Sequence, residues 1–201
     1  MSQSNRNMVT HQVAVWDCKT SEYPKTPPFH PPLRYPEYRF DECDPSNVIY
    51  PAFRDMLLAM ELDRDNFGTE RWNPFGEMVK PGMHVLVKPN WVRHFHEKGK
   101  NIASVIVHSS LLRAVIDYTL IALQDHGTIV IGDAPLLDAD FDEIIRITQV
   151  DELLSWYREH SNVSFRLIDF RSERNLKGRF RMSRSVPFCN LRMSRSATVP
   201  G

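Results

Sequence analysis

Residues 128–135 read Thr-Ile-Val-Ile-Gly-Asp-Ala-Pro. The run begins with β-branched and mostly apolar residues, which is typical of a strand buried on both faces, and it ends abruptly in a polar loop. Residues 85–90 (Val-Leu-Val-Lys-Pro-Asn) and residues 163–171 (Val-Ser-Phe-Arg-Leu-Ile-Asp-Phe-Arg) change from strand-like to polar in the same way. If the three strands are parallel, their polar ends lie on one edge of one sheet, which is where open α/β folds bind ligands.

Helical patterns lie between these strands. Apolar residues recur at helical spacing over residues 111–123, after a cap at Ser109 or Ser110, and again over 141–148 and 150–160. A further helix is predicted at residues 48–61. The alternation of strand and helix from residue 84 to 168 predicts an α/β fold with three layers, in which helices flank a mostly parallel, Rossmann-like sheet with right-handed crossovers. Such sheets usually have about five or six strands, and only about four are found here, so we expect an incomplete domain.

The chain divides into four segments. Residues 1–19 form a first strand region around Val13-Ala14-Val15-Trp16, and residues 20–46 form a proline-rich, extended arm. Residues 47–171 form the partial α/β domain, and residues 172–201 form a basic, irregular tail. Proline removes backbone donors and disfavours helix in the residue before it, which is why the arm is expected to be irregular.

Composition and hydropathy give no support for a nucleic-acid-binding, membrane or secreted protein. The chain has 201 residues, of which 42% are hydrophobic and 25% charged, and its formal net charge is zero. Such values are close to those of an average soluble protein and give no general argument for binding nucleic acid or an anionic membrane. No apolar run approaches the roughly 18–20 residues that span a bilayer, and the polar start lacks the apolar stretch of a secretory signal, so a cytoplasmic location is expected.

The cysteines, Cys18, Cys43 and Cys189, are far apart and form no Cys-x-x-Cys pair. This spacing argues against a disulfide framework, a structural zinc site and an iron–sulfur cluster held by this chain alone. Free thiols in a reducing compartment are therefore expected.

The arm and the tail each allow more than one interpretation. Aromatic residues interleave with the prolines of residues 20–46, so the arm can pack on its own domain or on a second copy, which would give a homo-oligomer. A proline-rich ligand for a recognition module is a weaker alternative, because the aromatic residues are typical of packing anchors. The tail contains seven arginines and lysines against one acid, Glu173. It is either a contact for nucleic acid or acidic lipid, or a segment unrelated to the fold.

Several motifs resemble, in order and spacing, the family known as the domain of unknown function numbered 362. They are Lys80-Pro81-Gly82, the run from Val85 to Val92, His108, the helix Leu111–Leu123, and the run from Ile129 to Pro135. The resemblance covers residues 80–171 and implies an α/β domain whose activity is unsettled. Some members carry ferredoxin-like cysteine motifs, which this chain lacks, so iron–sulfur chemistry does not carry over. Members are typically longer, and residues 172–201 do not resemble the later part of the family's domain, which suggests a truncated domain.

Four residues at two strand ends are candidates for binding a ligand: Lys88, Asn90, Gly132 and Asp133. Lys88 can neutralise a phosphate, a carboxylate or a neighbouring aspartate, and Asn90 tolerates a turn while offering a donor and an acceptor. Gly132 allows close backbone approach, and Asp133 can hold a metal, accept a proton or bind a hydroxyl. The structural alternative is a turn in which Lys88 pairs with Asp133. Neither a dinucleotide-binding glycine motif nor a P-loop is present.

Histidines supply the remaining candidates. His108 precedes a helix and can meet an anion or polarise a carbonyl, so it joins Asp133 as a catalytic candidate, with a capping or packing role as the alternative. His94 and His96, followed by Glu97, form the most metal-like cluster, although the segment is predicted to be a loop. Metal sites usually draw ligands from several elements, so solvated loop histidines are the alternative.

The leading hypothesis is that the carboxyl-terminal edge of the sheet binds a small anionic metabolite carrying a phosphate or carboxylate, with a divalent metal as a candidate cofactor. Whether a reaction follows is left open. One alternative is a non-catalytic binding or assembly module that uses the proline-rich arm. Another is an inactive partial domain.

Overall fold

The computed structural model describes residues 13–17 and 22–173. Its centre is a parallel sheet of three strands, β1 (His84–Val87), β2 (Thr128–Asp133) and β3 (Ser164–Asp169), which lie side by side in the order β1-β2-β3. The predicted parallel pairing of the three runs is therefore confirmed.

The register of the sheet brings its polar ends together as predicted. His84 pairs with Thr128 and Thr128 with Ser164, so the three strands begin level with one another. At the other end Asp133 pairs with Asp169. Consequently, the carboxyl ends of β2 and β3 place two aspartates at the same edge.

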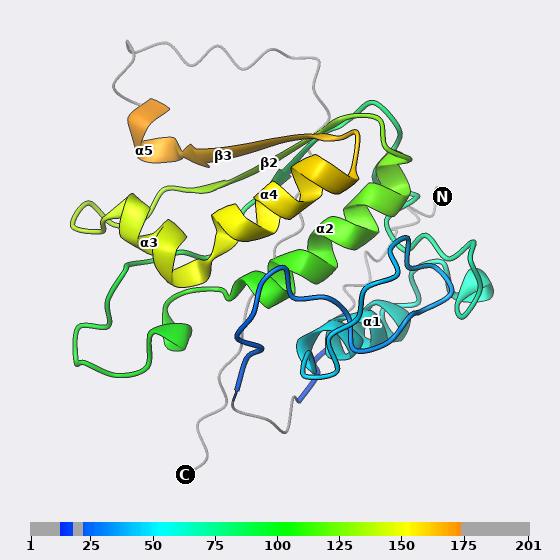
Figure 1. Cartoon of the computed structure of the whole chain (residues 1–201), viewed down its shortest axis with the longest axis horizontal. Coiled ribbons are helices and arrows are strands. Elements are labelled where there is room, and N and C mark those ends of the chain that lie inside the picture. The colour runs from blue at the N-terminus through cyan, green and yellow to red at the C-terminus, as the bar shows by residue number, and fades with distance from the viewer. Residues whose placement is uncertain (1–12, 18–21, 174–201) are drawn as a thin grey trace, which may run out of the picture.

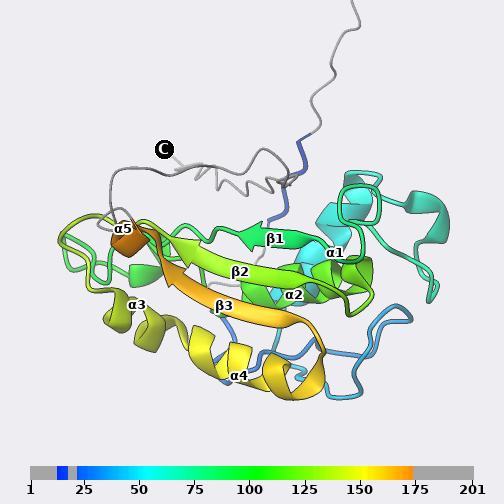
Figure 2. The same cartoon turned by 90° about the horizontal axis from the view of Figure 1, so that it is seen from above.

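Helices alternate with the strands and confirm the predicted α/β class. They are α1 (Ile49–Ala59), α2 (Ser109–Leu123), α3 (Phe141–Thr148), α4 (Val150–His160) and α5 (Phe170–Glu173), with short 3₁₀ turns η1 (Arg64–Asn66) and η2 (Ile102–Ser104). Right-handed crossovers between strands in sequential order put their helices on the same face of a sheet. Figures 1 and 2 show α2 and α4 together on one side, so two of the three expected layers are seen in the described part of the chain.

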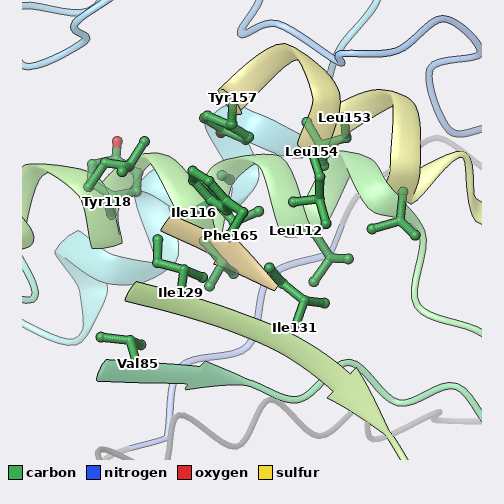
Figure 3. Packing of buried hydrophobic residues seen from close by; sticks show 14 of the residues in the cluster. Val85, Leu112, Ile116, Tyr118, Ile129, Ile131, Leu153, Leu154, Tyr157 and Phe165 are labelled. Carbon is green, nitrogen blue, oxygen red and sulfur yellow. The ribbon is translucent and has the colours of Figure 1, made fainter. Parts of the chain in front are cut away.

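The core lies between the sheet and these two helices. One face of every strand points into it because side chains alternate along a strand. Figure 3 shows this contact, which is made by Val85, Ile129, Ile131 and Phe165 from the strands, Leu112 and Ile116 from α2, and Leu153, Leu154 and Tyr157 from α4. Each such side chain stabilises the fold by roughly 1.5–3 kcal/mol relative to its exposure in water.

The proline-rich arm packs on its own domain. Residues 22–46 contain no helix or strand, as predicted, and Phe29 and Tyr38 are buried. The Asn47 side chain, at the end of the arm, donates to the Phe29 and His30 carbonyls over 2.8 and 2.9 Å. Two of the arm's aromatic anchors are thus used within the chain, and a homo-oligomer through the arm stays a prediction.

A buried ion pair lies beneath the arm. Within α2, Arg113 donates to Asp117 over 3.0 Å, and both side chains are almost fully buried. The hydroxyls of Tyr157 and Tyr50 donate to the two oxygens of Asp117 over 2.5 and 3.1 Å, and burial raises the pKa of both tyrosines. The Arg113 guanidinium also lies 4.1 Å from the centre of the Trp156 ring. This cluster joins α1, α2 and α4.

One predicted segment differs from the expectation, and another lies mostly outside the described residues. Residues 13–17 are irregular rather than forming the predicted first strand, since none of the described strands pairs with them. The basic tail, apart from its first two residues, lies outside the described residues, as do residues 1–12 and 18–21.

Candidate functional site

The ends of β1 and β2 are joined by an ion pair. The Lys88 ammonium lies 2.7 Å from an oxygen of Asp133, and the side chains are 55% and 5% exposed. The backbone N–H of Trp91 donates to the other oxygen over 2.8 Å, and that of Ala134 donates to the first over 2.7 Å. Three donors therefore fix the buried carboxylate. The structure contains the pairing that the sequence offered as the structural alternative.

Proline and a tight loop explain how the chain leaves β1. Pro89 has no N–H to continue the ladder, and the Asn90 carbonyl instead accepts from Val107 over 3.2 Å. Trp91 then pairs with Ile106 in a single antiparallel bridge. The long loop is thus closed at its base, and the exposed Asn90 lies close to the start of α2.

Gly132 has a structural reason to lack a side chain. A Cβ at this position would lie against the Ile168 carbonyl and 2.9 Å from the Phe170 ring. The close approach that the sequence suggested for a ligand is therefore made by the end of β3 and the start of α5. Direct ligand binding by Gly132 stays a prediction.

A second carboxylate, Asp169, lies at the same edge and was not among the candidate site residues. Asp169 accepts from the Arg171 guanidinium over 3.0 and 2.6 Å, and this contact lowers the Asp169 pKa. The same guanidinium donates to the carbonyls of Leu136 and Ala139. Arg171 thus fastens the loop after β2 to the end of β3. The polar run that follows the third strand was the available signal, but it gave no indication of these partners.

His108 is a half-buried helix cap. Its Nδ1 accepts from the backbone N–H of Ser110, at the start of α2, over 3.1 Å, which puts the proton of the neutral ring on Nε2. Tyr23 stacks on the ring with centroids 4.5 Å apart, and Phe29 meets it edge-on. Burial lowers the His108 pKa to about 4, so the ring is neutral at pH 7. These contacts match the capping alternative, and a catalytic role for His108 stays a prediction.

Each of the two loop histidines accepts a hydrogen bond from a backbone N–H group. His94 Nδ1 accepts from the N–H of Asp140 over 2.9 Å, and His96 Nδ1 accepts from that of Lys98 over 3.0 Å. Within the described ranges, no group of three or more His, Cys, Asp or Glu side chains could hold a metal ion. Metal binding by His94 and His96 stays a prediction.

Two shallow cavities lie along the arm rather than at the sheet edge. One, of about 430 Å³, lies between the Pro27-Pro28 pair and α4, and the other, of about 320 Å³, lies between the arm and the start of α1. Both are open depressions whose linings do not include the strand-end residues. The ion pairs at the edge are a better guide to a site than these cavities, because ligands of open α/β sheets bind at the carboxyl ends of the strands.

Comparison with protein-family models, with curated proteins and with solved structures finds no match for this chain. Separately, none of the helices in the described residues is long and apolar enough to cross a membrane.

Proposed function

We propose that the carboxyl-terminal edge of the sheet binds a small anionic molecule, through contact between its phosphate or carboxylate group and the Lys88 ammonium. The observation that supports this most is the asymmetry of the ion pair. Asp133 is buried and held by three donors, whereas the Lys88 side chain is 55% exposed. An ammonium has three donors, so one can stay on Asp133 while another meets a ligand.

Neighbouring groups favour an anion at this position. Asp169, the other carboxylate at this edge, is paired with Arg171, which offsets its repulsion. The start of α2 lies at the same edge, and the partial positive charge of a helix N-terminus attracts anions. Asn90 is exposed beside it and can donate through its amide.

We favour binding over catalysis at this edge. Chemistry at a charged centre benefits from excluding water, and the Lys88 side chain remains more than half exposed. A ligand held in such an open position exchanges rapidly unless another element covers it. The proposed role is therefore that of a metabolite-binding domain, with Asp133 as the group that positions Lys88.

We also propose that residues 80–171 belong to the domain family numbered 362. The support is the order of the strand-end motifs, which fall on β1, the start of α2 and β2. Because the activity of that family is unsettled, the resemblance adds no substrate to the proposal.

Thermal unfolding followed by circular dichroism tests the site. The full chain is heated with inorganic phosphate, citrate, phosphorylated sugars and nucleotides, each as a separate series. A ligand that binds only the folded state raises the Tm according to its concentration over its Kd. We expect at least one of these anions to raise the Tm, and Lys88→Ala to abolish the rise.

Lys80→Ala is the matched control. Lys80 is an exposed lysine near the other end of β1, where its ammonium donates to the Gly76 carbonyl. The Lys80→Ala protein should keep the full ligand-induced rise. If both variants lose it equally, the anion binds by general charge rather than at the proposed edge. If no anion in the panel shifts the parent protein, the proposal fails.

A further inference from the structure

The strand β1 forms one edge of the sheet. In the part of the chain that the structure describes, β1 pairs only with β2, so one side of His84–Val87 presents backbone donors and acceptors without a neighbouring strand. Edge strands of this kind are templates for pairing with another segment. The strand is short, with four residues, and its Val85 is buried while Leu86 and Val87 are half-buried.

A segment suited to this edge lies exposed elsewhere in the same chain. Val13-Ala14-Val15-Trp16 has the β-branched and aromatic composition that strands favour, yet it is irregular. The side chains of Val13, Val15 and Trp16 are 84%, 80% and 50% exposed. Its apolar residues fall on both alternating faces, as in strands of parallel sheets that are covered on both sides.

The segment does not lie against the edge of its own sheet. In Figure 2 the dark blue segment lies toward the β1 side, but in Figure 1 it lies at the bottom with α1, away from the sheet at the top. Tyr23, which stacks on His108, anchors the chain beyond it at the start of α2. An extended chain spans about 3.3–3.6 Å per residue, so residues 17–22 give the segment roughly 20 Å of reach from that anchor.

We infer that residues 13–16 of one copy pair with the outer edge of β1 in a second copy, and that the exchange is reciprocal. In the single chain neither the segment nor the edge has a strand partner among the described residues, and exchange between two copies provides both. A reciprocal contact of this kind closes with two-fold symmetry and gives a homodimer. The contact is made by residues 13–16 and not by the aromatic anchors of the arm.

Side-chain alternation makes the pairing specific. With Val13 and Val15 on the helix-covered face next to Val85 and Val87, Ala14 and Trp16 fall on the open face next to Leu86. The open face then gains an aromatic side chain over a half-buried leucine.

Sedimentation velocity over a range of protein concentrations tests the dimer. We expect the full chain to dimerise, and Val15→Asp and Val15→Pro each to raise the dimer Kd by at least about tenfold, since one buries a charge and the other removes a ladder donor. The control is Leu137→Asp, because Leu137 is also apolar and is 95% exposed. It should leave the Kd unchanged. A chain that is monomeric at all concentrations overturns the inference, as does a dimer that Val15→Asp leaves intact.

Isotope mixing then separates exchange between copies from pairing within one chain. A photo-crosslinking residue is placed at position 14, and ¹⁴N- and ¹⁵N-labelled proteins are unfolded together, refolded and irradiated. Cross-linked peptides that contain residues 84–87 and join a light to a heavy chain support the exchange. Cross-links confined to light–light and heavy–heavy pairs would show that the segment pairs with its own β1, and would refute it.

Discussion

Two ion pairs of similar geometry differ in what surrounds them. Lys88 and Asp133 meet over 2.7 Å at the sheet edge, and Arg113 and Asp117 meet over 3.0 Å inside the helical layer. The Arg113 side chain is 0% exposed, whereas that of Lys88 is 55% exposed. Arg113 also donates to the Tyr38 hydroxyl over 2.8 Å, so the donors of the buried arginine are used in hydrogen bonds within the protein. In the edge pair, the Asp133 carboxylate is hydrogen-bonded at both oxygens but the Lys88 ammonium remains accessible to solvent. The ammonium is therefore suited to contact a ligand.

Breaking the buried pair should have the largest effect. Asp117→Leu leaves the Arg113 charge buried without its carboxylate, and we expect the free energy of unfolding to fall by about 3–5 kcal/mol. Urea denaturation of the purified variant measures it.

The double variant Arg113→Met/Asp117→Leu is the control for this prediction. It removes both charges and fills the space with apolar groups, so it should be more stable than Asp117→Leu alone. Equal or greater destabilisation in the double variant would mean that the tyrosine hydrogen bonds, and not the unpaired charge, carry the effect.

A smaller effect is expected from acid, through the histidine at the start of the helix that carries the buried pair. Burial lowers the His108 pKa to about 4 from an ordinary value of 6.5, so the unfolded chain binds a proton more readily. The stabilisation is complete above pH 6.5 and is lost as the pH falls toward 4. At pH 5 the loss is about 2 kcal/mol relative to neutral pH.

His108→Asn isolates this contribution, because asparagine can still cap the helix but does not titrate. The free energy of unfolding should fall less steeply between pH 7 and pH 5 in the variant than in the parent protein. Parallel profiles for the two proteins would assign the acid sensitivity to other groups, such as His30, whose pKa burial also lowers.

Effects no larger than that of the buried pair are expected at the edge pair, where Lys88→Ala should have the smallest effect of all, and the two members should differ. Asp133→Ala leaves the N–H groups of Trp91 and Ala134 without their acceptor, at a cost of about 1–3 kcal/mol. Lys88→Ala should cost less than about 1 kcal/mol, because water can replace an exposed ammonium. Chemical denaturation of both variants provides the comparison, and a larger loss for Lys88→Ala would mean that the lysine is structural.

Local patterns predicted much of the fold. The alternation of strands and helices from residue 84 to 168 follows from periodicity within short windows, and the common edge follows from parallel pairing. The Lys88–Asp133 pair was foreseeable, because Lys88 directly follows β1 and Asp133 is the last residue of the neighbouring strand β2. Even the capping role of His108 was one of two interpretations that the sequence allowed.

The buried cluster could not be predicted in the same way. Arg113 and Asp117 look like an ordinary helix pair four residues apart, and only their partners reveal their burial. Those partners, Tyr50 and Tyr157, lie 67 and 40 residues from Asp117 along the chain. Residues 13–17 show the opposite failure, since their composition favours a strand but a strand also needs a neighbour.

The long-range contacts that anchor the arm affect the order in which the protein can fold during translation. Each strand of the sheet lies next to the one made before it, so the sheet can grow in step with a nascent chain. The arm is made earlier but binds to groups made much later: Arg113 donates to the Pro28 carbonyl across 85 residues, and Arg39 pairs with Asp125 across 86. Closing such long loops is slow relative to local pairing. The arm therefore leaves the ribosome before the rest of the domain that it packs against, and is among the last segments to reach its place.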